Sequence, residues 1–373
     1  MTTNVRGLVD GIASEPESIT ADWLTAVLRG DGAIRRASVA SFEVQKIGQG
    51  RGLIGRVLRI LLHYDVEERR APPTLIVKLS PADPELRDRV FELYEREIRF
   101  YTRLAPKVEL RTPHLYHGSS DARTADAVLV LEDLSDFRRG EHVSGCSLER
   151  ARLVVSHLAR LHARWSRPQW RRKLSWLPDF SEDLEPEADA AFLQKVHALC
   201  AARWGEKFPP RALELAARFA GSASRLRAML ATSPRTLVHG DLRLDNIFFG
   251  PTRNPTRPAL IDWQLARRAP GVMDVAYFVA LNLDTTTRRR VELDLLKAYH
   301  SALTKDARGY GFERCLRDFR IAIVFMFFRL MTAAALLDFA GKRAQACLDS
   351  WIRRGAVMMD DHDVGAFLER RAE

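Results

Sequence analysis

The chain has 373 residues, of which 46% are hydrophobic and 28% are charged. This balance excludes an intrinsically disordered chain and leaves room for one large or two medium domains with a sizeable core. The formal net charge of +10 raises the question of a nucleic-acid partner, but basic residues stand beside acidic ones in tracts such as ERCLRDFR, and no nucleic-acid-binding motif occurs. We therefore expect no nucleic-acid partner, and a basic surface that attracts anionic ligands.

The cysteines and the apolar runs bear on the compartment of the protein. The four cysteines are far apart and none has the spacing of a metal site, which favours a reduced, cytoplasmic environment. The first 18 residues lack an apolar core of signal-peptide length, so we expect no export. The apolar tract 321–328 is bounded by Arg320 and Arg329. It is shorter than the roughly 20 residues of a membrane span, and it predicts a buried helix and no membrane partner.

The first elements in chain order are a helix and a strand. Residues 17–30 have an apolar face at helical spacing, with Ser18 or Thr20 as the N-terminal cap. Residues 39–47 change to a strand-like pattern and lead into a glycine-rich loop.

The loop IGQGRGLIG contains a GxGxxG pattern made by Gly50, Gly52 and Gly55. In a dinucleotide-binding unit a helix follows these glycines, with an acidic residue about 20 positions later. Here the β-favouring run RVLRILLHYD follows, which predicts a strand–loop–strand hairpin. Kinases use such a hairpin to lay backbone amides over the nucleotide phosphates. A flexible hairpin without a chemical role fits the same pattern.

A third strand, PTLIVKLS, carries one lysine within an apolar run. A buried ammonium is costly unless it is paired or bound to an anion, so Lys78 needs a negative partner. The next helix, predicted from about Pro84 to Ala105, places Glu97 on its apolar face. Each side chain alone could extend from the rim of the core to water, but in this order they predict an ion pair.

The boundary between two domains is predicted near residue 134. The run AVLVLEDLS at 127–135 indicates a buried strand that ends in an acidic turn, and from Ser147 onward helical periodicity dominates. His162 lies late in the first of these helices, beside apolar neighbours, so we assign it a structural role.

The most informative stretch is HGDLRLDNIFFG at 239–250, followed by LIDWQ at 260–264. Phosphoryl transfer needs an oriented hydroxyl nucleophile and a divalent metal that neutralises charge on the phosphate oxygens. Asp241 suits the first task, and the oxygen atoms of Asn246 and Asp262 suit magnesium. An ordinary polar turn and a strand-end aspartate would use the same residues, but the ordered spacing of both tracts favours chemistry.

These tracts resemble the catalytic loop and metal-binding aspartate of the aminoglycoside phosphotransferase, choline kinase and ecdysteroid kinase-like superfamily, which has the protein-kinase-like fold. The resemblance implies that Asp241 is the catalytic base and that Asn246 and Asp262 hold magnesium. It also implies that Asp274, in the APGVMD tract, braces the catalytic loop through backbone amides.

The same resemblance assigns nucleotide-binding roles to the N-terminal part. The glycines would cover the phosphates, the lysine of the third strand would grip them and pair with the glutamate of the next helix, and the backbone after the last strand would hold adenine. The residues assigned in this way are Gly50, Gly52, Lys78, Glu97, Glu132 and Leu134.

The fold implied is a two-lobed α+β, protein-kinase-like architecture. Residues 1–134 would form a small lobe with a mainly antiparallel sheet and one packed helix, and residues 135–373 a larger helical lobe with the catalytic and substrate-binding groups. A protein kinase is disfavoured, because no activation segment or APE-type tract follows Asp262.

We therefore expect an enzyme that uses ATP and Mg²⁺ to phosphorylate a hydroxyl group of a small molecule. The alternative is a nucleotide-binding regulatory or scaffold protein of the same fold without turnover, yet none of the expected catalytic groups is missing. The final 90 residues contain many arginines, which disfavour a polycationic aminoglycoside and favour a neutral or anionic substrate.

Overall fold

The computed structural model describes residues 2–5, 12–48, 55–180, 190–250, 257–304, 309–337, 339 and 341–369. The chain divides into two compact units, Met1–Arg138 with Ala259–Leu265, and Arg139–Pro258 with Ala266–Glu373. The tract Ala259–Leu265, which the sequence prediction placed in the C-terminal lobe, is thus part of the first unit.

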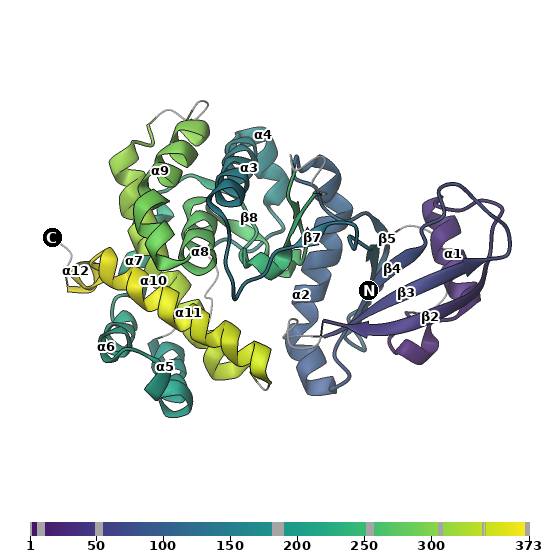
Figure 1. The fold of residues 1–373 in the computed structure, drawn as a ribbon, viewed down its shortest axis with the longest axis horizontal. Helices are drawn as coiled ribbons and strands as arrows, with labels where there is room; N and C mark the ends of the chain where they lie inside the picture. The colour runs from purple at the N-terminus through teal and green to yellow at the C-terminus, as the bar shows by residue number, and fades with distance from the viewer. Residues whose placement is uncertain are drawn as a thin grey trace. The chain divides into compact units, whose positions relative to one another are not determined.

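The first unit is built on a six-stranded antiparallel sheet with the order β1-β5-β6-β4-β3-β2 (Figure 1). The four strands that alternation or apolar runs predicted are present. The sequence analysis missed β5, a polar run, and β1. The strands are β1 (Thr2–Val5), β2 (Val39–Ile47), β3 (Arg56–Tyr64), β4 (Thr74–Leu79), β5 (Leu115–Asp121) and β6 (Asp126–Glu132).

Both faces of this sheet carry a helix, where the prediction allowed only one. Helix α1 (Ala21–Asp31), capped by the Thr20 side chain, packs with Leu75, Val77 and Leu79 of β4 in one apolar core. Side chains alternate between the faces of a strand, so Lys78 points to the opposite face. That face is covered by α2 (Pro84–Arg103).

Short elements complete the first unit. The 3₁₀ turn η1 (Pro16–Ser18) precedes α1, and η2 (Ala105–Lys107) follows α2. The returning tract contributes β10 (Ala259–Leu260) and the turn η7 (Trp263–Leu265).

The second unit is mainly helical, as predicted. Its first helix, α3 (Leu148–Ser166), begins at the predicted cap Ser147. The short strands β8 (Arg235–Val238) and β11 (Arg267–Pro270) pair antiparallel and flank the catalytic-loop sequence. The other helices are α4 (Pro168–Arg171), α5 (Ala190–Trp204), α6 (Pro210–Phe219), α7 (Ala223–Ala231), α8 (Val272–Asn282), α9 (Thr285–Thr304), α10 (Phe312–Leu336), α11 (Lys342–Asp361) and α12 (Val364–Glu369).

Helix α10 contains the apolar tract predicted to be a buried helix. Within the described residues it is the helix whose length and composition would suffice to cross a membrane, and 67% of its most apolar window is buried inside the protein. Its phenylalanines pack with Phe180 and Phe219, with ring centroids 5.0 and 5.2 Å from that of Phe325. These contacts are those of a core helix.

Candidate active site

A buried charged cluster lies in the first unit, on the face of the sheet covered by α2. Lys78 Nζ is 2.6 Å from Glu97 Oε2 and 2.9 Å from Asp262 Oδ1, and it donates to Gln264 Oε1 at 3.3 Å. Glu97 is 1% exposed and Lys78 is 8% exposed. The structure therefore joins the predicted lysine–glutamate pair to the predicted metal-binding aspartate.

The charges in this cluster stabilise one another. Burial opposes the charged form of Lys78, but the carboxylates of Asp262 and Glu97 more than offset it and raise the pKa of the ammonium above its usual value. Burial raises the pKa of Glu97. Without the lysine, two carboxylates would share a poorly solvated space, which is costly.

The position of Asp262 is fixed by its neighbour in the IDW tract. The Trp263 ring stacks on Phe100 of α2, with a centroid distance of 4.0 Å and an interplanar angle of 8°, and its Nε1 donates to the carbonyl of Leu260 at 3.2 Å. Asp262 has a φ of 66°, in the left-handed region that non-glycine residues seldom adopt. Such strain is concentrated at functional positions and is sustained by surrounding packing, which Trp263 supplies here.

The glycine-rich loop is described only at its two ends, at Gly48 and at Gly55. The predicted phosphate-binding residues Gly50 and Gly52 lie outside the described residues. Gly55 has a φ of +86°, and a Cβ added there would come within 1.8 Å of the Tyr94 hydroxyl. Only glycine fits this position, for conformational and for steric reasons.

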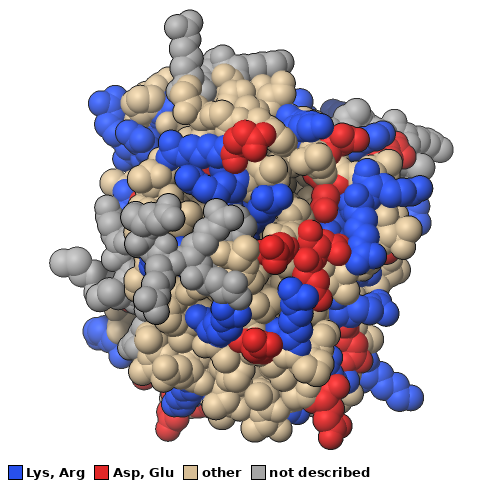
Figure 2. Space-filling view, turned by 90° about the vertical axis from the view of Figure 1, so that its left-hand side faces the viewer, with Lys and Arg blue, Asp and Glu red and all other residues tan. Residues whose placement is uncertain are grey.

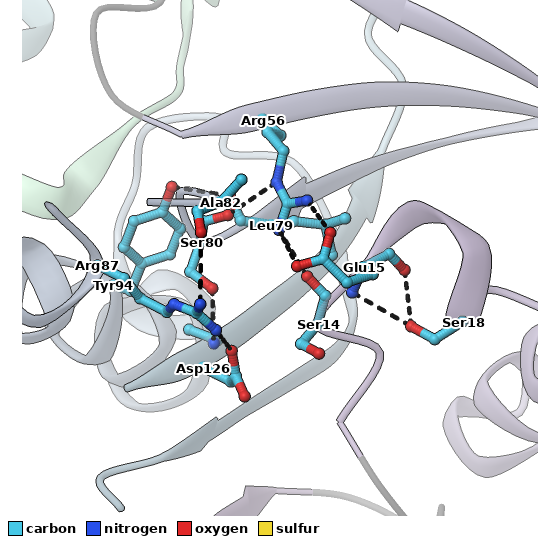
Figure 3. A network of polar contacts seen from close by, with 11 residues as sticks. Ser14, Glu15, Ser18, Arg56, Leu79, Ser80, Ala82, Arg87, Tyr94 and Asp126 are labelled. Carbon is cyan, nitrogen blue, oxygen red and sulfur yellow. Dashed lines mark hydrogen bonds and ion pairs between the residues drawn. The ribbon is translucent and has the colours of Figure 1, made fainter. Parts of the chain in front are cut away.

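Tyr94 of α2 and Arg56 of β3 both donate to backbone carbonyls at the end of β4, beside the exit of the glycine loop (Figure 3). Tyr94 donates its hydroxyl to the Leu79 carbonyl at 2.9 Å, and its ring centroid is 5.3 Å from Lys78 Nζ. Arg56 donates to the Ser80 carbonyl at 3.0 Å and pairs with Glu15. The loop exit is thus tied to the strand that carries Lys78.

The predicted adenine-binding segment follows β6. The Glu132 carboxylate pairs with Arg111 and accepts the backbone N–H of His114 at 2.9 Å, and Leu134 is buried. The Glu132 and Leu134 side chains therefore make contacts within the first unit. The adenine contacts predicted for the backbone of this segment stay a prediction.

The catalytic loop in the second unit is held by an aspartate of α8. Asp274 accepts the backbone N–H groups of His239 at 2.7 Å and of Gly240 at 3.0 Å. Burial opposes ionisation of Asp274, but the neighbouring His162, 3.5 Å away, and the loop donors hold the pKa of the carboxyl below its usual value. The predicted bracing role of Asp274 is confirmed. His162 is buried, and its Nδ1 lies 3.0 Å from the Tyr299 hydroxyl. This agrees with the structural role that the sequence analysis assigned to it.

Both carboxylate oxygens of Asp241 are oriented by hydrogen bonds. The Oδ1 atom accepts the hydroxyl of Tyr277 at 2.8 Å, and Oδ2 accepts Asn246 Nδ2 at 3.1 Å and lies 3.2 Å from Arg243 Nε. Asn246 Nδ2 also donates to the Asp241 carbonyl at 3.0 Å. Because its amide nitrogen is turned toward Asp241, the Oδ1 atom of Asn246 is the one available to a metal.

Three residues around the catalytic loop were missed by the sequence analysis. Tyr277 orients Asp241, and Asn282 donates to the Leu242 carbonyl at 2.7 Å and accepts the Leu244 N–H at 2.9 Å. Arg354 of α11 donates to the Leu281 carbonyl at 2.8 Å. Polar residues at Asp274, Tyr277 and Asn282 share one side of an otherwise apolar helix. This spacing of polar residues is the sequence signal that could have identified Tyr277 and Asn282.

Comparison with known proteins decides the family. A model described as "Phosphotransferase enzyme family" matches residues 59–313. The chain belongs to this family. The prediction of the superfamily is confirmed. No curated protein matches the chain.

Solved structures confirm the fold of this phosphotransferase. A candidate aminoglycoside phosphotransferase from Ralstonia eutropha is 15% identical, with a TM-score of 0.53, over 91% of this chain and 97% of that one. A choline kinase from Cryptosporidium parvum is 10% identical, with a TM-score of 0.52, over 88% and 94%. A Plasmodium vivax ethanolamine kinase is 12% identical, with a TM-score of 0.51, over 91% and 89%. The two-lobed α+β, protein-kinase-like architecture is therefore that of the family.

The side chains of two residues of the phosphotransferase have the chemistry of magnesium ligands. Among the described residues no group of three or more His, Cys, Asp or Glu side chains could enclose a metal alone. Magnesium in kinases typically takes one or two protein carboxylate or amide oxygens and completes its shell with phosphates and water. Asp262 in the first unit and Asn246 in the second each carry an oxygen of this kind.

Proposed function

We propose that this phosphotransferase transfers the γ-phosphoryl group of ATP to a hydroxyl group of a small molecule, with Mg²⁺ as the metal. The observation that carries the proposal is the triple support of the Asp241 carboxylate by Tyr277, Asn246 and Arg243. A carboxylate so oriented, at the end of a braced turn, suits a general base. It would accept the hydroxyl proton as the new O–P bond forms and the bond to ADP breaks.

Residues of the first unit would bind the nucleotide phosphates. Lys78, restrained by Glu97, would contact the phosphates, and Asn246 and Asp262 would hold magnesium, which neutralises phosphate charge. ATP as donor, in preference to GTP, and the cytoplasmic location are part of the proposal.

We propose a neutral or anionic acceptor for this enzyme. The names of similar structures include aminoglycoside phosphotransferase, choline kinase and ethanolamine kinase, whose named substrates carry amino or ammonium groups. In this chain arginines are abundant around the helical unit, and the face drawn in Figure 2 carries basic side chains beside acidic ones. This mixed surface favours neither a polycationic substrate nor a nucleic acid.

A coupled ADP-release screen tests the proposed function. The purified protein would receive Mg-ATP with aminoglycosides, choline-like amines, hydroxy acids, hydroxyacyl-CoA esters and sterols. We expect magnesium-dependent ADP release with a neutral or anionic alcohol. Efficient turnover of kanamycin-type compounds alone would overturn the acceptor class but not the kinase reaction. Binding of ATP without release of ADP for any acceptor would favour the regulatory or scaffold alternative.

A further inference from the structure

The turn that carries Asn246 is buried within the second unit. This 3₁₀ turn, η6 (Leu244–Asn246), ends at the proposed magnesium ligand, and its three residues are 1 to 3% exposed. The amide nitrogen of Asn246 donates to Oδ2 of Asp241 at 3.1 Å. A displacement of η6 would therefore move the magnesium ligand and one support of the proposed base together.

The backbone of η6 is held from two sides. Asn282 of α8 accepts the Leu244 N–H at 2.9 Å, and Arg139 Nε donates to the Asp245 carbonyl at 2.7 Å. Gly140, next to Arg139, lies so close that an added Cβ would be 2.5 Å from the Leu244 carbonyl oxygen. None of these three contacts involves the Asp245 carboxylate.

The Asp245 carboxylate is paired with α11. Arg343, the second residue of that helix, donates from Nη2 to Asp245 Oδ1 at 2.8 Å. The side chain of Asp245 is 4% exposed. A buried carboxylate without a cationic partner is strongly destabilised, and a hydrogen bond between charged groups is stronger than a neutral one. The conformation of η6 therefore depends on a residue that lies 98 positions further along the chain.

Arg343 also has a more exposed partner. Its Nη1 donates to Glu141 Oε1 at 3.0 Å, and the side chain of Glu141 is 42% exposed. An ion pair exposed to this extent contributes little, because water and salt screen it. The buried pair with Asp245 is thus the one that bears on the turn, and Glu141 provides a matched control.

From this geometry we infer that Arg343 is a positioning residue for the metal site, which acts through Asp245 to fix the turn that presents Asn246 to magnesium. The inference rests on the proposed function, in which Asn246 is a magnesium ligand. Removal of a group that supports a metal ligand from outside the coordination shell typically weakens metal binding by roughly 10–100-fold. Arg343 acts through the neighbour of the ligand, so we expect a loss of about tenfold, at the lower end of that range.

Binding of Mn²⁺ in the presence of ADP tests the inference without turnover. Mn²⁺ prefers the same oxygen ligands as Mg²⁺, and electron paramagnetic resonance distinguishes its free and bound forms. The purified wild type would be compared with Arg343→Gln and Glu141→Gln, each at a temperature at which it is folded. Arg343→Gln should bind Mn²⁺ about tenfold more weakly, and Glu141→Gln should bind it like the wild type. Equal affinities in wild type and Arg343→Gln, equal losses in the two variants, or no Mn²⁺ binding by the wild type would overturn the inference.

Asp245→Asn tests whether the effect passes through Asp245. The amide keeps the shape of the carboxylate and removes its charge, so this variant also serves if Arg343→Gln does not fold. It should weaken Mn²⁺ binding about as much as Arg343→Gln, and the double variant should lose no more than either single one, because both changes break the same pair. Losses that add in full, or a wild-type affinity in Asp245→Asn, would overturn the inference.

Kinetics separates a positioning role from a purely structural one. In the ADP-release assay, Arg343→Gln should raise the Mg²⁺ concentration for half-maximal rate about tenfold. Its kcat at saturating Mg²⁺ should not change, because the lost interaction concerns metal binding and not the chemical step. A fall in kcat that Mg²⁺ does not reverse would overturn the inference. If no acceptor supports ADP release by the wild type while Mn²⁺ binding changes as expected, the proposed reaction is overturned and the positioning role stands.

Discussion

The Tyr277 hydroxyl donates to Oδ1 of Asp241 over 2.8 Å, so a helix after the catalytic loop orients the proposed base. Burial, with the nearby Asp241 carboxylate as the second cause, raises the pKa of Tyr277 well above its usual value. The hydroxyl therefore remains a donor at neutral pH. An incoming acceptor hydroxyl would meet a carboxylate whose position is already set.

Replacing Tyr277 by phenylalanine removes this hydrogen bond and keeps the ring. A hydrogen bond to a charged group contributes about 1.5 kcal/mol or more, so we expect kcat to fall about tenfold. The nucleotide KM should stay the same, because the Lys78 cluster is untouched. Steady-state kinetics measure both values. An unchanged kcat would show that Asp241 needs no support from α8.

The second prediction concerns Gly55 and Tyr94. In Gly55→Ala the new Cβ would meet the Tyr94 hydroxyl, whereas Gly32, which also has a positive φ, has nothing within 4 Å. Gly32→Ala should therefore cost about 1 kcal/mol from backbone strain. Gly55→Ala should cost at least about 1 kcal/mol more from overpacking, and its KM for ATP should rise.

The control for this prediction is the double variant Gly55→Ala with Tyr94→Phe. Loss of the hydroxyl removes the contact at 1.8 Å, while the Leu79 carbonyl oxygen would still lie 3.0 Å from the new Cβ. The two changes should therefore be less destabilising together than the sum of the single changes. Denaturant unfolding of the four proteins gives the coupling free energy. Strict additivity would contradict the steric explanation.

The third prediction is a dependence of stability on pH that comes from His142. Burial, together with the nearby Arg354, lowers the pKa of His142 from 6.5 to about 3. A group whose folded pKa is depressed in this way binds protons more readily in the unfolded chain. Stability is therefore lost as pH falls below 6.5, by about 2 kcal/mol at pH 5.

Unfolding free energies at pH 7 and pH 5 measure this effect. His142→Met removes the titration, so the variant should lose about 2 kcal/mol less than the wild type over this interval. At pH 7 the variant should be less stable, because the Nδ1 contact of His142 with Asn282 at 3.1 Å is lost. Parallel losses in both proteins would contradict the assignment to His142.

Sequence patterns predicted the elements whose local signal is strong. Apolar runs and alternation identified β2, β3, β4 and β6, and Thr20 and Ser147 cap the helices as expected. Strand β5 was missed because LYHGSSD is largely polar, and its pairing with β6 is decided by the sheet. The sequence analysis predicted helix 17–30 but gave it no packing partner. It therefore missed that this helix covers the second face of the sheet.

The site residues also divide into those with a local sequence signal and those that depend on long-range contacts. Lys78, Glu97, Asp241, Asn246 and Asp262 were identified from ordered motifs, and the structure joins Lys78 to Glu97 and Asp262, and Asp241 to Asn246. The left-handed backbone conformation of Asp262 could not be predicted from its residue type. It is sustained by the packing of Trp263, which is a long-range contact. The supports from Tyr277, Asn282 and Arg354 depend on long-range contacts that a local pattern does not contain.

The most direct test of the central claim compares wild type with Asp241→Ala for phosphoryl transfer and for binding of Mg-ATP. We expect the variant to lose at least about 100-fold in kcat, the contribution of a general base, while the dissociation constant for Mg-ATP changes less than twofold. Asp262→Ala should weaken Mg-ATP binding as well. Full transferase activity in Asp241→Ala would contradict the account.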